Sequence, residues 1–213
     1  MTWADLSTLP VDSVVPAGFK YEQLSRPDIN ELVKKIQGWY PDIRVGSARG
    51  FLDPAFYESR VSIAGEEEKD LIVYVCKYEA EIASMVCIER DMDSSTMQGR
   101  LAIVAPRYRN SGLAGFGPFI LDQQARAMKI AMVYNRVSLK HGYAQRLVES
   151  AGFALVGIIP ASDREMVEPG TVKHVPEALY VKVYASESAL FAPAAQSMTE
   201  NVHALWQQLF SRQ

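Results

Sequence analysis

The spacing of apolar residues along the chain predicts a fold that mixes strands and helices. Alternating or continuous apolar runs favour β-strands at residues 19–24, 71–77, 82–89, 100–105, 132–139, 155–159 and 179–184. Between these runs, apolar residues recur at helical spacing in residues 27–38, 54–60, 113–128 and 142–151. Gly152 stands where a helix commonly ends. The order of these segments indicates the α/β (α+β) class with a central sheet.

Residues 70–90 predict a β-hairpin with apolar side chains on both faces. Pairing the two strands about a polar turn near Glu79 places Cys76 opposite Ala83. In this register one face carries Leu71, Val73, Val75, Val86 and Ile88, and the other carries Ile72, Tyr74, Ala83 and Met85. Because both faces are apolar, we expect helices on both sides of the sheet.

The two ends of the chain differ from its centre. Residues 1–17 contain Pro10 and Pro16 among scattered apolar residues, which predicts an extended arm lying on a body formed by residues 18–185. Residues 186–213 are predicted to be a helical appendage. Its apolar residues follow the spacing of a docked amphipathic helix: Val202, Leu205, Trp206, Leu209 and Phe210. The same stripe could bury against a sister subunit, so a homodimer stays open.

Composition favours one domain with an appendage over two full domains. The chain has 213 residues, of which 48% are hydrophobic, enough to bury a sizeable core. Its 22 Lys and Arg residues face 25 Asp and Glu residues, and the net charge of −3 is spread along the chain. This balance disfavours a dedicated nucleic-acid binder.

The N-terminal residues, the cysteines and the histidines bear on location and metal binding. Asp5 stands where a signal peptide would need positive charge, and no apolar run approaches the roughly 20 residues of a membrane span. We therefore expect a cytoplasmic protein without a membrane partner. Cys76 and Cys87 are not opposite each other in the hairpin, which argues against a disulfide. The histidines lack metal-ligand spacing: His141, His174 and His203.

The segment between the strand at residues 100–105 and the helix at residues 113–128 carries the clearest chemistry. A glycine-containing loop that leads into a helix presents free backbone N–H groups and the positive end of the helix dipole. Gly112 and Ala114 keep side chains away from the main chain, and Arg109 adds positive charge. The loop is a candidate phosphate site, although small residues at a helix start also serve packing alone.

This loop and its surroundings resemble the GCN5-related N-acetyltransferase (GNAT) family. The family motif Arg-x-x-Gly-x-Ala is matched at Arg109, Gly112 and Ala114, and a Pro-x-Tyr-Arg lead-in occupies residues 106–109. A short helix that ends in Gly-Phe at residues 152–153 is also similar to the family. The resemblance covers about residues 70–160 and, more loosely, the whole chain. It implies a mixed, mostly antiparallel central sheet flanked by helices on both faces.

The family's signature loop holds the pyrophosphate of acetyl-CoA. The resemblance therefore implies that acetyl-CoA, or another acyl-CoA, is bound by Arg109, Asn110, Ser111, Gly112, Leu113 and Ala114. It also implies that the strands at residues 101–105 and 133–139 diverge, with a β-bulge at the end of the earlier strand. Pantetheine would enter the gap and pair with main-chain groups near Ile103 and Val104, as an added strand does.

The residues for proton transfer depart from the family pattern. Val148 occupies the position where the family often has a Tyr, and the strand residues 99–102 lack the common Glu. His141 follows the strand at residues 132–139, at a position often taken by Asn. Because imidazole titrates near neutral pH, His141 is the predicted general acid or base. A histidine that caps the next helix or contacts CoA is the alternative.

The resemblance implies that residues 18–185 form an N-acyltransferase domain, most simply an acetyltransferase whose acceptor is a small-molecule or peptide amine. Residues 26–65 and an insertion at residues 161–178 would recognise the acceptor, the insertion being a lid or a surface loop with a turn at residues 169–170. The missing Tyr and Glu leave open a catalytically silent acyl-CoA-binding module that regulates a partner. A nucleotide loop at residues 112–117 is disfavoured because no Lys-Ser/Thr follows.

Overall fold

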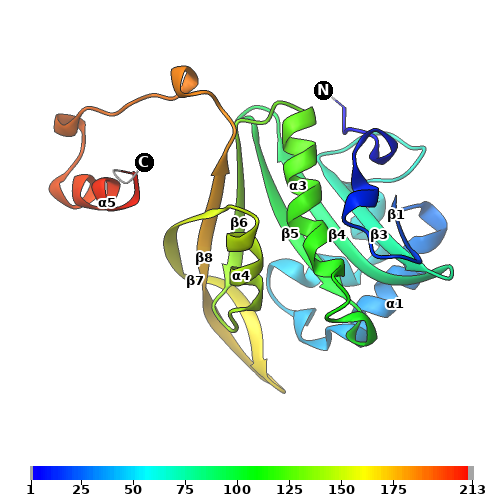
Figure 1. Ribbon diagram of the computed structural model, residues 1–213. Helices are drawn as coiled ribbons and strands as arrows, with labels where there is room; N and C mark the ends of the chain where they lie inside the picture. Colours follow the sequence, from blue (N-terminus) through cyan, green and yellow to red (C-terminus); the bar gives the residue numbers. More distant parts are fainter. Residues whose placement is uncertain (1, 211–213) are drawn as a thin grey trace.

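Within residues 2–210, the part of the chain that the structure describes, one eight-stranded sheet forms the centre of the molecule (Figure 1). The structure is a computed structural model. The strands follow the order β1-β3-β4-β5-β6-β8-β7, and β2 pairs with β3 off this path. The β2–β3 and β5–β6 pairs are parallel and the other pairs are antiparallel. The predicted mixed, mostly antiparallel sheet is confirmed.

The strands and helices have the following bounds. The strands are β1 (Phe19–Gln23), β2 (Val61–Ser62), β3 (Leu71–Tyr78), β4 (Glu81–Asp91), β5 (Thr96–Val104), β6 (Met132–Ser138), β7 (Ala154–Glu168) and β8 (Thr171–Val183). The helices are α1 (Ile29–Trp39), α2 (Pro54–Arg60), α3 (Phe116–Ala127), α4 (Tyr143–Ser150) and α5 (Glu200–Phe210). β5 begins four residues earlier than predicted, and α3 begins after a 3-10 turn, η7 (Leu113–Gly115).

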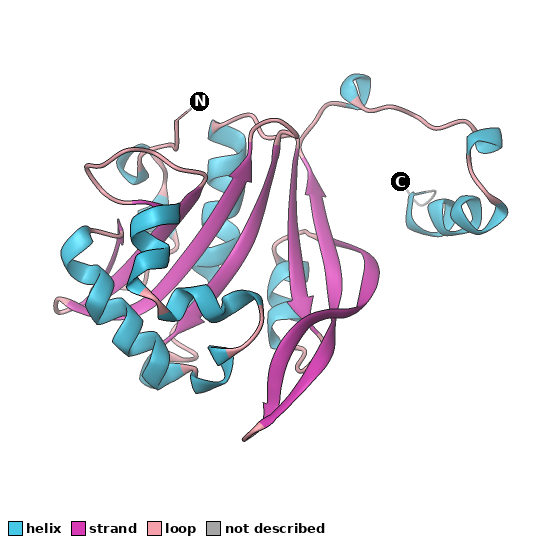
Figure 2. Ribbon diagram, turned by 180° about the vertical axis from the view of Figure 1, so that it is seen from behind, coloured by secondary structure: helices cyan, strands magenta, loops and turns pink. Residues whose placement is uncertain are grey.

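Helices cover both faces of the sheet, as predicted. α3 and α4 lie on the face towards the viewer in Figure 1, and α1 and α2 lie on the face seen in Figure 2. The apolar residues of α1 recur at helical spacing and are buried: Ile29, Leu32, Val33 and Ile36. α2 begins after Asp53, whose side chain accepts the N–H of Ala55 as an N-cap.

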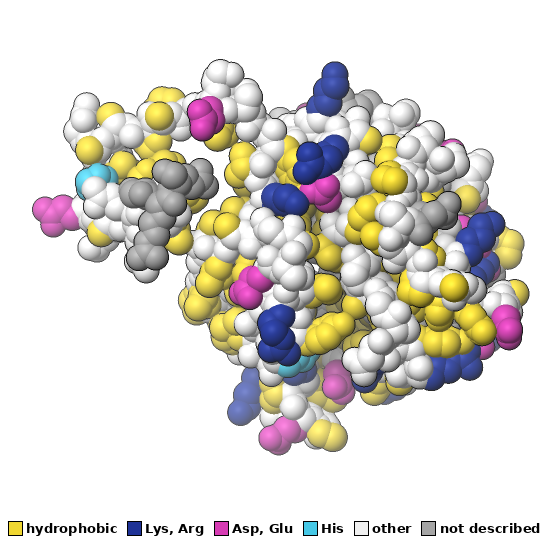
Figure 3. Space-filling view, in the orientation of Figure 1, with side chains coloured by type: hydrophobic (Ala, Val, Ile, Leu, Met, Phe, Trp, Pro, Cys, Tyr) yellow, Lys and Arg dark blue, Asp and Glu magenta, His cyan; other side chains and the backbone are white. Residues whose placement is uncertain are grey.

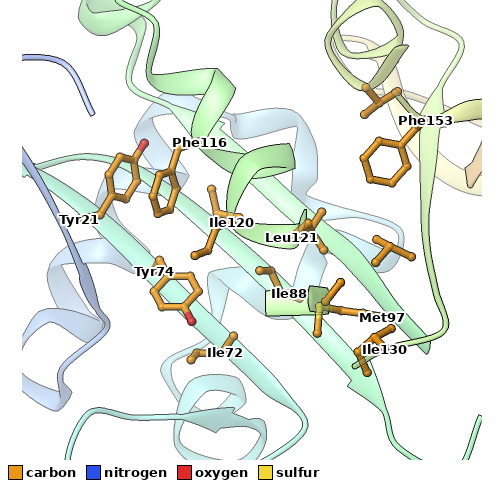
Figure 4. Packing of buried hydrophobic residues seen from close by; sticks show 14 of the residues in the cluster. Tyr21, Ile72, Tyr74, Ile88, Met97, Phe116, Ile120, Leu121, Ile130 and Phe153 are labelled. Carbon is orange, nitrogen blue, oxygen red and sulfur yellow. The ribbon is translucent and has the colours of Figure 1, made fainter. Parts of the chain in front are cut away.

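Two apolar cores hold these layers together, one on each face of the sheet. On the α3 face, Ile120 and Leu121 pack over apolar side chains of β3, β4 and β5 (Figure 4). The Tyr21 ring of β1 stacks on the Phe116 ring of α3, with ring centroids 3.4 Å apart. The Tyr21 hydroxyl also donates to the Leu113 carbonyl at 3.1 Å. The first strand therefore fixes the start of α3, next to the candidate phosphate loop.

The β3–β4 hairpin forms as predicted, but its register is shifted by one residue. A β-bulge leaves Ala83 without a partner in β3, so Cys76 lies opposite Ser84 rather than opposite Ala83. Apolar periodicity cannot reveal such a bulge, because an extra residue leaves the composition of both strands unchanged. Cys76 and Cys87 are free thiols that lie in different cores.

The shifted register also corrects the predicted faces of β4. A one-residue slip moves every following side chain to the opposite face of the sheet. Val86 and Ile88 accordingly lie in the core under α3, and Met85 lies in the core under α1. The prediction had placed each of these three residues on the other face. Its conclusion that both faces are covered is confirmed.

The predicted insertion at residues 161–178 is part of a long β-hairpin rather than a loop. β7 and β8 continue through it and meet at the predicted turn, where Gly170 has a φ of +77°. The pairing shifts register at three places along β7. Polar residues dominate this segment, so apolar alternation does not reveal the strands. The hairpin extends well beyond the rest of the sheet (Figure 2).

The N-terminal arm contacts both α3 and the loop before β3. Trp3 is buried, and its indole N–H donates to the Lys69 carbonyl at 2.9 Å. The Gln124 side chain accepts the N–H of Ala4 and donates to the carbonyl of the same residue. The arm contains the short 3-10 helices Leu6–Thr8 and Val11–Ser13, so it is less extended than predicted.

The predicted C-terminal helix forms, but it does not dock on the sheet as expected. The chain leaves the body after β8 and carries α5 away from it (Figure 1), with hydrophobic side chains visible on its surface in Figure 3. No described residue of α5 is buried, and Trp206 and Leu205 are 39% and 52% exposed. Helical spacing predicts an amphipathic helix without specifying what covers it. No helix formed by residues 2–210 has the length and apolar character needed to cross a membrane.

Asp122 ties α3 to the end of β8. Its carboxylate accepts hydrogen bonds from Lys182 Nζ at 2.7 Å and from the Tyr184 hydroxyl at 2.8 Å, and it pairs with Arg126 at 2.7 Å. Burial alone would raise the pKa of Asp122, but these hydrogen bonds lower it from 3.8 to about 2. The folded state therefore favours the charged carboxylate.

We expect Asp122→Asn to lower the free energy of unfolding by about 2 kcal/mol at neutral pH. Because the folded state has the lower pKa, this contribution is complete above about pH 4 and fades as the pH falls towards about 2. Urea unfolding at pH 7 and at about pH 3 measures the difference between wild type and variant. A difference that does not shrink in acid would contradict this role of the carboxylate.

Candidate active site

The pairing of β5 with β6 ends halfway along both strands. Thr96 to Gly99 pair in parallel with Met132 to Asn135, and no β5 residue beyond Gly99 pairs with β6. Figure 2 shows the two strands separating beyond this point. Arg100 has no partner on β4, because Gly99 lies opposite Ile88 and Leu101 lies opposite Cys87. The expected β-bulge is present, but it lies where the strands separate rather than at the end of β5.

Beyond the bulge, one edge of β5 has no neighbouring strand among residues 2–210. The Ala105 N–H donates to the Ala83 carbonyl on β4 at 2.8 Å. Main-chain groups alternate in direction along a strand, so those of Ala102 and Val104 point away from β4, towards the gap. The main chain of Ile103 faces β4 instead, and its side chain is buried in the α1-side core. Val104 is therefore placed to pair with an added strand-like group.

The candidate phosphate loop follows β5 directly. A 3-10 turn, η6 (Pro106–Tyr108), leads to Asn110 and Gly112, which have φ angles of +69° and +91°. In the described part of the chain, the N–H groups of Gly112, Leu113 and Ala114 donate no hydrogen bond. These groups lie at the start of η7 and α3, where helix N–H groups are free to bind an anion.

Aromatic and charged side chains hold this loop against the sheet. The Tyr108 ring packs edge-on against Phe19 of β1, with ring centroids 5.3 Å apart, and also contacts Tyr78. Arg107 forms an ion pair with Glu81 at the start of β4. The Arg109 guanidinium lies 5.2 Å from the ring centroid of Tyr40, which follows α1. The loop is thus fixed from both faces of the sheet.

Asn135 and Gly99 mark the point where β5 and β6 separate. A Cβ on Gly99 would lie 2.5 Å from Asn135 Oδ1, so only glycine allows this side chain to pack against β5. Asn135 is buried, and its Nδ2 finds no hydrogen-bond partner in the described residues. An unsatisfied buried N–H costs about 1–3 kcal/mol and is rare. This N–H group is therefore suited to donate a hydrogen bond to a ligand oxygen.

Glu89 is a candidate site residue that the sequence did not suggest. It lies on β4, on the α1 side of the sheet, and lines a cavity of about 540 Å³ at the separation of β5 and β6. Its Oε2 accepts hydrogen bonds from Gln98 Nε2 at 3.0 Å and from Arg100 Nη1 at 3.1 Å. Glu89 Oε1 has no hydrogen-bond partner within residues 2–210. A carboxylate directly after the apolar run at residues 85–88 was the available signal, but only the pairing with Gln98 and Arg100 gives it a position.

His141 lies in the loop between β6 and α4, beyond the wide end of the gap. Its side chain is exposed, and its carbonyl accepts a hydrogen bond from Gln145 Nε2 at 3.4 Å. Six residues separate it from Asn135, where the strands part. Val148 of α4 is buried in the core on the α3 side. The structure therefore places Glu89 nearer than His141 to the narrow end of the gap.

The α1–α2 segment, residues 41–52, touches the long β7–β8 hairpin across the α1 face. The Ser47 N–H and hydroxyl donate to the Asp163 carboxylate, at 3.0 and 2.6 Å. Gly46 has a φ of +78°, and a Cβ there would lie 2.1 Å from the Arg164 carbonyl oxygen. These contacts thus join the two segments predicted to recognise an acceptor, residues 26–65 and 161–178.

Solved acetyltransferase structures share the overall fold of this chain. Mutant forms of the spermidine/spermine N-acetyltransferase SpeG from Vibrio cholerae align with a TM-score of 0.62 and 13% identity, over 78% of this chain and 94% of that chain. The ribosomal-protein-S18-alanine N-acetyltransferase from Escherichia coli aligns with a TM-score of 0.59 and 14% identity, over 81% and 99%. An IAA acetyltransferase from Bacillus cereus gives 0.56 and 12%, over 78% and 99%. The chain has the GNAT fold.

Sequence comparison adds little to this structural likeness. No protein-family model and no curated protein matches the chain. At identities of 9–14%, the solved structures establish the GNAT fold and leave the activity to be argued from the residues of the site. The GNAT-like sheet, with diverging strands beside the Arg109 to Ala114 loop, agrees with the fold implied by the sequence motif.

We expect Gly46→Ala to release the β7–β8 hairpin from the α1–α2 segment, because the added Cβ would overlap the Arg164 carbonyl. A non-glycine residue at this φ also costs about 1 kcal/mol or more. Hydrogen exchange should rise in residues 161–178 while the rest of the sheet stays protected. Gly38→Ala is the matched control, since nothing lies within 4 Å of its added Cβ. Unchanged exchange in Gly46→Ala would show that the latch does not hold the hairpin.

Proposed function

We propose that this chain is an acyl-CoA-dependent N-acyltransferase that transfers the acetyl group of acetyl-CoA to an amine. One observation carries the proposal: the unpaired edge of β5 runs directly into a loop with three consecutive free N–H groups. The edge suits the amide-containing pantetheine arm, and the loop suits a diphosphate. The GNAT fold supports the same assignment.

The residues present fit acetyl-CoA in two independent ways. The free N–H groups at Gly112, Leu113 and Ala114 would bind the diphosphate, with Arg109, Asn110 and Ser111 completing the loop. The orphaned Asn135 Nδ2 at the separation of the strands offers a donor to an oxygen of the bound group. Main-chain groups of Val104 would border the pantetheine path. Ile103 is the neighbouring residue, but its main-chain groups face β4. Acetyl-CoA would supply an activated thioester, which these residues bind and orient.

The proton chemistry falls to Glu89 and His141. Forming the new C–N bond and breaking the C–S bond releases one proton from the amine and requires one for the leaving thiolate. Glu89 is proposed to accept the amine proton through Oε1, while Gln98 and Arg100 hold Oε2. His141 remains a candidate for general acid or base through its place after β6. Val148 cannot take part, because its side chain is aliphatic and buried.

The acceptor is proposed to be an amine of a small molecule or a peptide. The similar structures are named as N-acetyltransferases of spermidine/spermine and of a ribosomal-protein alanine, so amines are the acceptors in both names. The cavity beside Glu89 is lined by residues of β4, β5, β6, β7 and β8. A cytoplasmic location and a homodimer joined through α5 are further proposals that follow from the sequence.

A catalytically silent acyl-CoA-binding module is the second candidate. The observation that favours it is Val148, a buried aliphatic residue of α4 at the position where the family often has a proton-donating Tyr. Under this alternative the loop would bind acetyl-CoA, and no amine would be acetylated. Glu89 weighs against it, because a silent module has no need of an oriented carboxylate at the separation of the strands.

Acetyl-CoA should bind the wild-type protein and should not bind Gly112→Asp, as measured by titration calorimetry. The substitution puts a negative charge beside the free N–H groups and forces a side chain onto a residue with a φ of +91°. Gly115→Ala is the control, because its added Cβ meets nothing within 4 Å, and it should bind like wild type. Equal binding by wild type and Gly112→Asp would refute the assigned loop.

Release of free CoA thiol in the presence of amines tests the chemistry. We expect Glu89→Gln to lower kcat by about 10²–10⁴-fold, since an amide cannot accept the amine proton. Its affinity for acetyl-CoA should stay unchanged. His141→Ala, measured in parallel, assigns the second role by lowering kcat with binding retained. A Glu89→Gln protein with wild-type turnover would remove Glu89 from the mechanism, and wild-type binding without turnover on any amine would favour the silent module.

A further inference from the structure

A second cavity, of about 390 Å³, lies between the α1–α2 segment and the β7–β8 hairpin. Its lining is strongly basic: Arg44 and Arg49 come from the α1–α2 segment, and Arg164 and His174 come from the hairpin. The latch between Ser47 and Asp163 brings these two segments together. Residues more than a hundred positions apart thus place three arginines in the lining of one cavity.

The positive charge of this cavity is not neutralised by the protein itself. In the part of the chain that the structure describes, no guanidinium of Arg44, Arg49 or Arg164 forms an ion pair or a hydrogen bond. Asp163 is the only acid in the lining. It already accepts hydrogen bonds from the N–H and hydroxyl of Ser47 and from the N–H of Arg164. Three guanidinium groups against one occupied carboxylate leave a net positive cavity.

This basic cavity adjoins the cavity of Glu89 along β7. Ile159 lines the cavity at the separation of β5 and β6, and Ala161 and Ser162 line the basic one. Strand residues advance by about 3.3 Å each, so the two spaces are about 10 Å apart or less. One extended acceptor can therefore reach both.

The opposite side of the Glu89 cavity is acidic. Glu89 also lines a third cavity, of about 460 Å³, where four acidic residues outnumber two arginines: Asp70, Glu89, Asp91 and Asp93 against Arg60 and Arg90. A positively charged amine is attracted to this end of the groove, and an anionic group is attracted to the arginines at the other end. The charges along the groove thus give an acceptor a preferred direction.

We propose that Arg44, Arg49 and Arg164 bind an anionic group of the acceptor, a carboxylate or a phosphate, while its amine lies at Glu89. The inference rests on the proposed function and narrows it to amines that carry an anion several bonds from the nitrogen. Guanidinium groups match carboxylate and phosphate geometry through paired N–H donors. Polyamines, whose far end is cationic, would be repelled from this cavity.

Amines that share a six-carbon chain and differ at the far end test the proposal. The acceptors are 6-aminohexanoate, 6-aminohexyl phosphate, neutral hexylamine and cationic 1,6-diaminohexane, each assayed by CoA thiol release. We expect kcat/KM to be about 10–100-fold higher for the anionic acceptors than for hexylamine, and lowest for the diamine. The carboxylate and the phosphate arms show which anion is preferred.

Substitution of the arginines should change binding of the anion rather than the chemical step. Arg164→Ala and the triple change of Arg44, Arg49 and Arg164 to Ala should raise KM for 6-aminohexanoate about 10-fold or more, with kcat and the hexylamine kinetics unchanged. Arg164→Glu should raise kcat/KM for 1,6-diaminohexane relative to kcat/KM for 6-aminohexanoate. Lys20→Ala is the control, because it removes an exposed charge of β1 outside the cavity and should leave kcat and KM for each amine unchanged.

Calorimetry with the reaction products separates this proposal from the proposed function. 6-Acetamidohexanoate should bind more tightly than its uncharged amide, and the advantage should vanish in the triple variant and weaken in high salt. This measurement decides the anion site even when no amine is turned over. Failure of acetyl-CoA to bind would overturn the proposed function alone. Equal affinity for the charged and uncharged products, or equal kcat/KM for anionic and neutral acceptors, would overturn the anion site.

Discussion

The early end of the β5–β6 pairing is the constraint on which the rest of the candidate site depends. Two parallel strands that share only four residue pairs leave the remaining edge of β5 without a partner. The bulge at Arg100 turns β5 away, and the Asn135 side chain, packed on Gly99, occupies the last position at which pairing continues. Unpaired main-chain groups are costly unless a ligand or water satisfies them. The unpaired main-chain groups of β5 therefore need hydrogen-bond partners, and the amides of a ligand would supply them.

The same separation places chemistry of different kinds at its two ends. The wide end leads into free N–H groups at the start of α3, which favour a highly charged diphosphate. The narrow end holds Asn135 on one face of the sheet and the Glu89 carboxylate on the other. An acceptor approaching from the α1 face therefore meets Glu89 at the point where the reacting end of the thioester is expected. The placement of these groups at the two ends of the separation is set by residue positions along β5 and β6, rather than by any single motif.

Local sequence signals predicted the parts of the structure that depend on neighbouring residues. The loop around Gly112, the bounds of α2 and the turn at Gly170 follow from short-range rules of glycine, proline and capping. Such rules could not predict the register of β4 in the sheet or the position of α5. A bulge at Ala83 reversed the faces of β4, and only contacts from residues of β5 give the Glu89 carboxylate a fixed position. The apolar stripe of α5 predicted its helix but not its exposed position.

The two halves of the site differ in how strongly they constrain the sequence. Under the proposed function, coenzyme binding would rely largely on main-chain N–H and C=O groups, which many sequences can present as long as residues 99 and 112 stay glycine. Acceptor binding would rely on side chains, in our proposal the arginines on the two segments that the Ser47–Asp163 contact joins. A chain can therefore keep the GNAT fold at 9–14% identity to its structural neighbours while its acceptor changes charge. On this view the β7–β8 hairpin and the α1–α2 segment, rather than the sheet, determine which amine is modified.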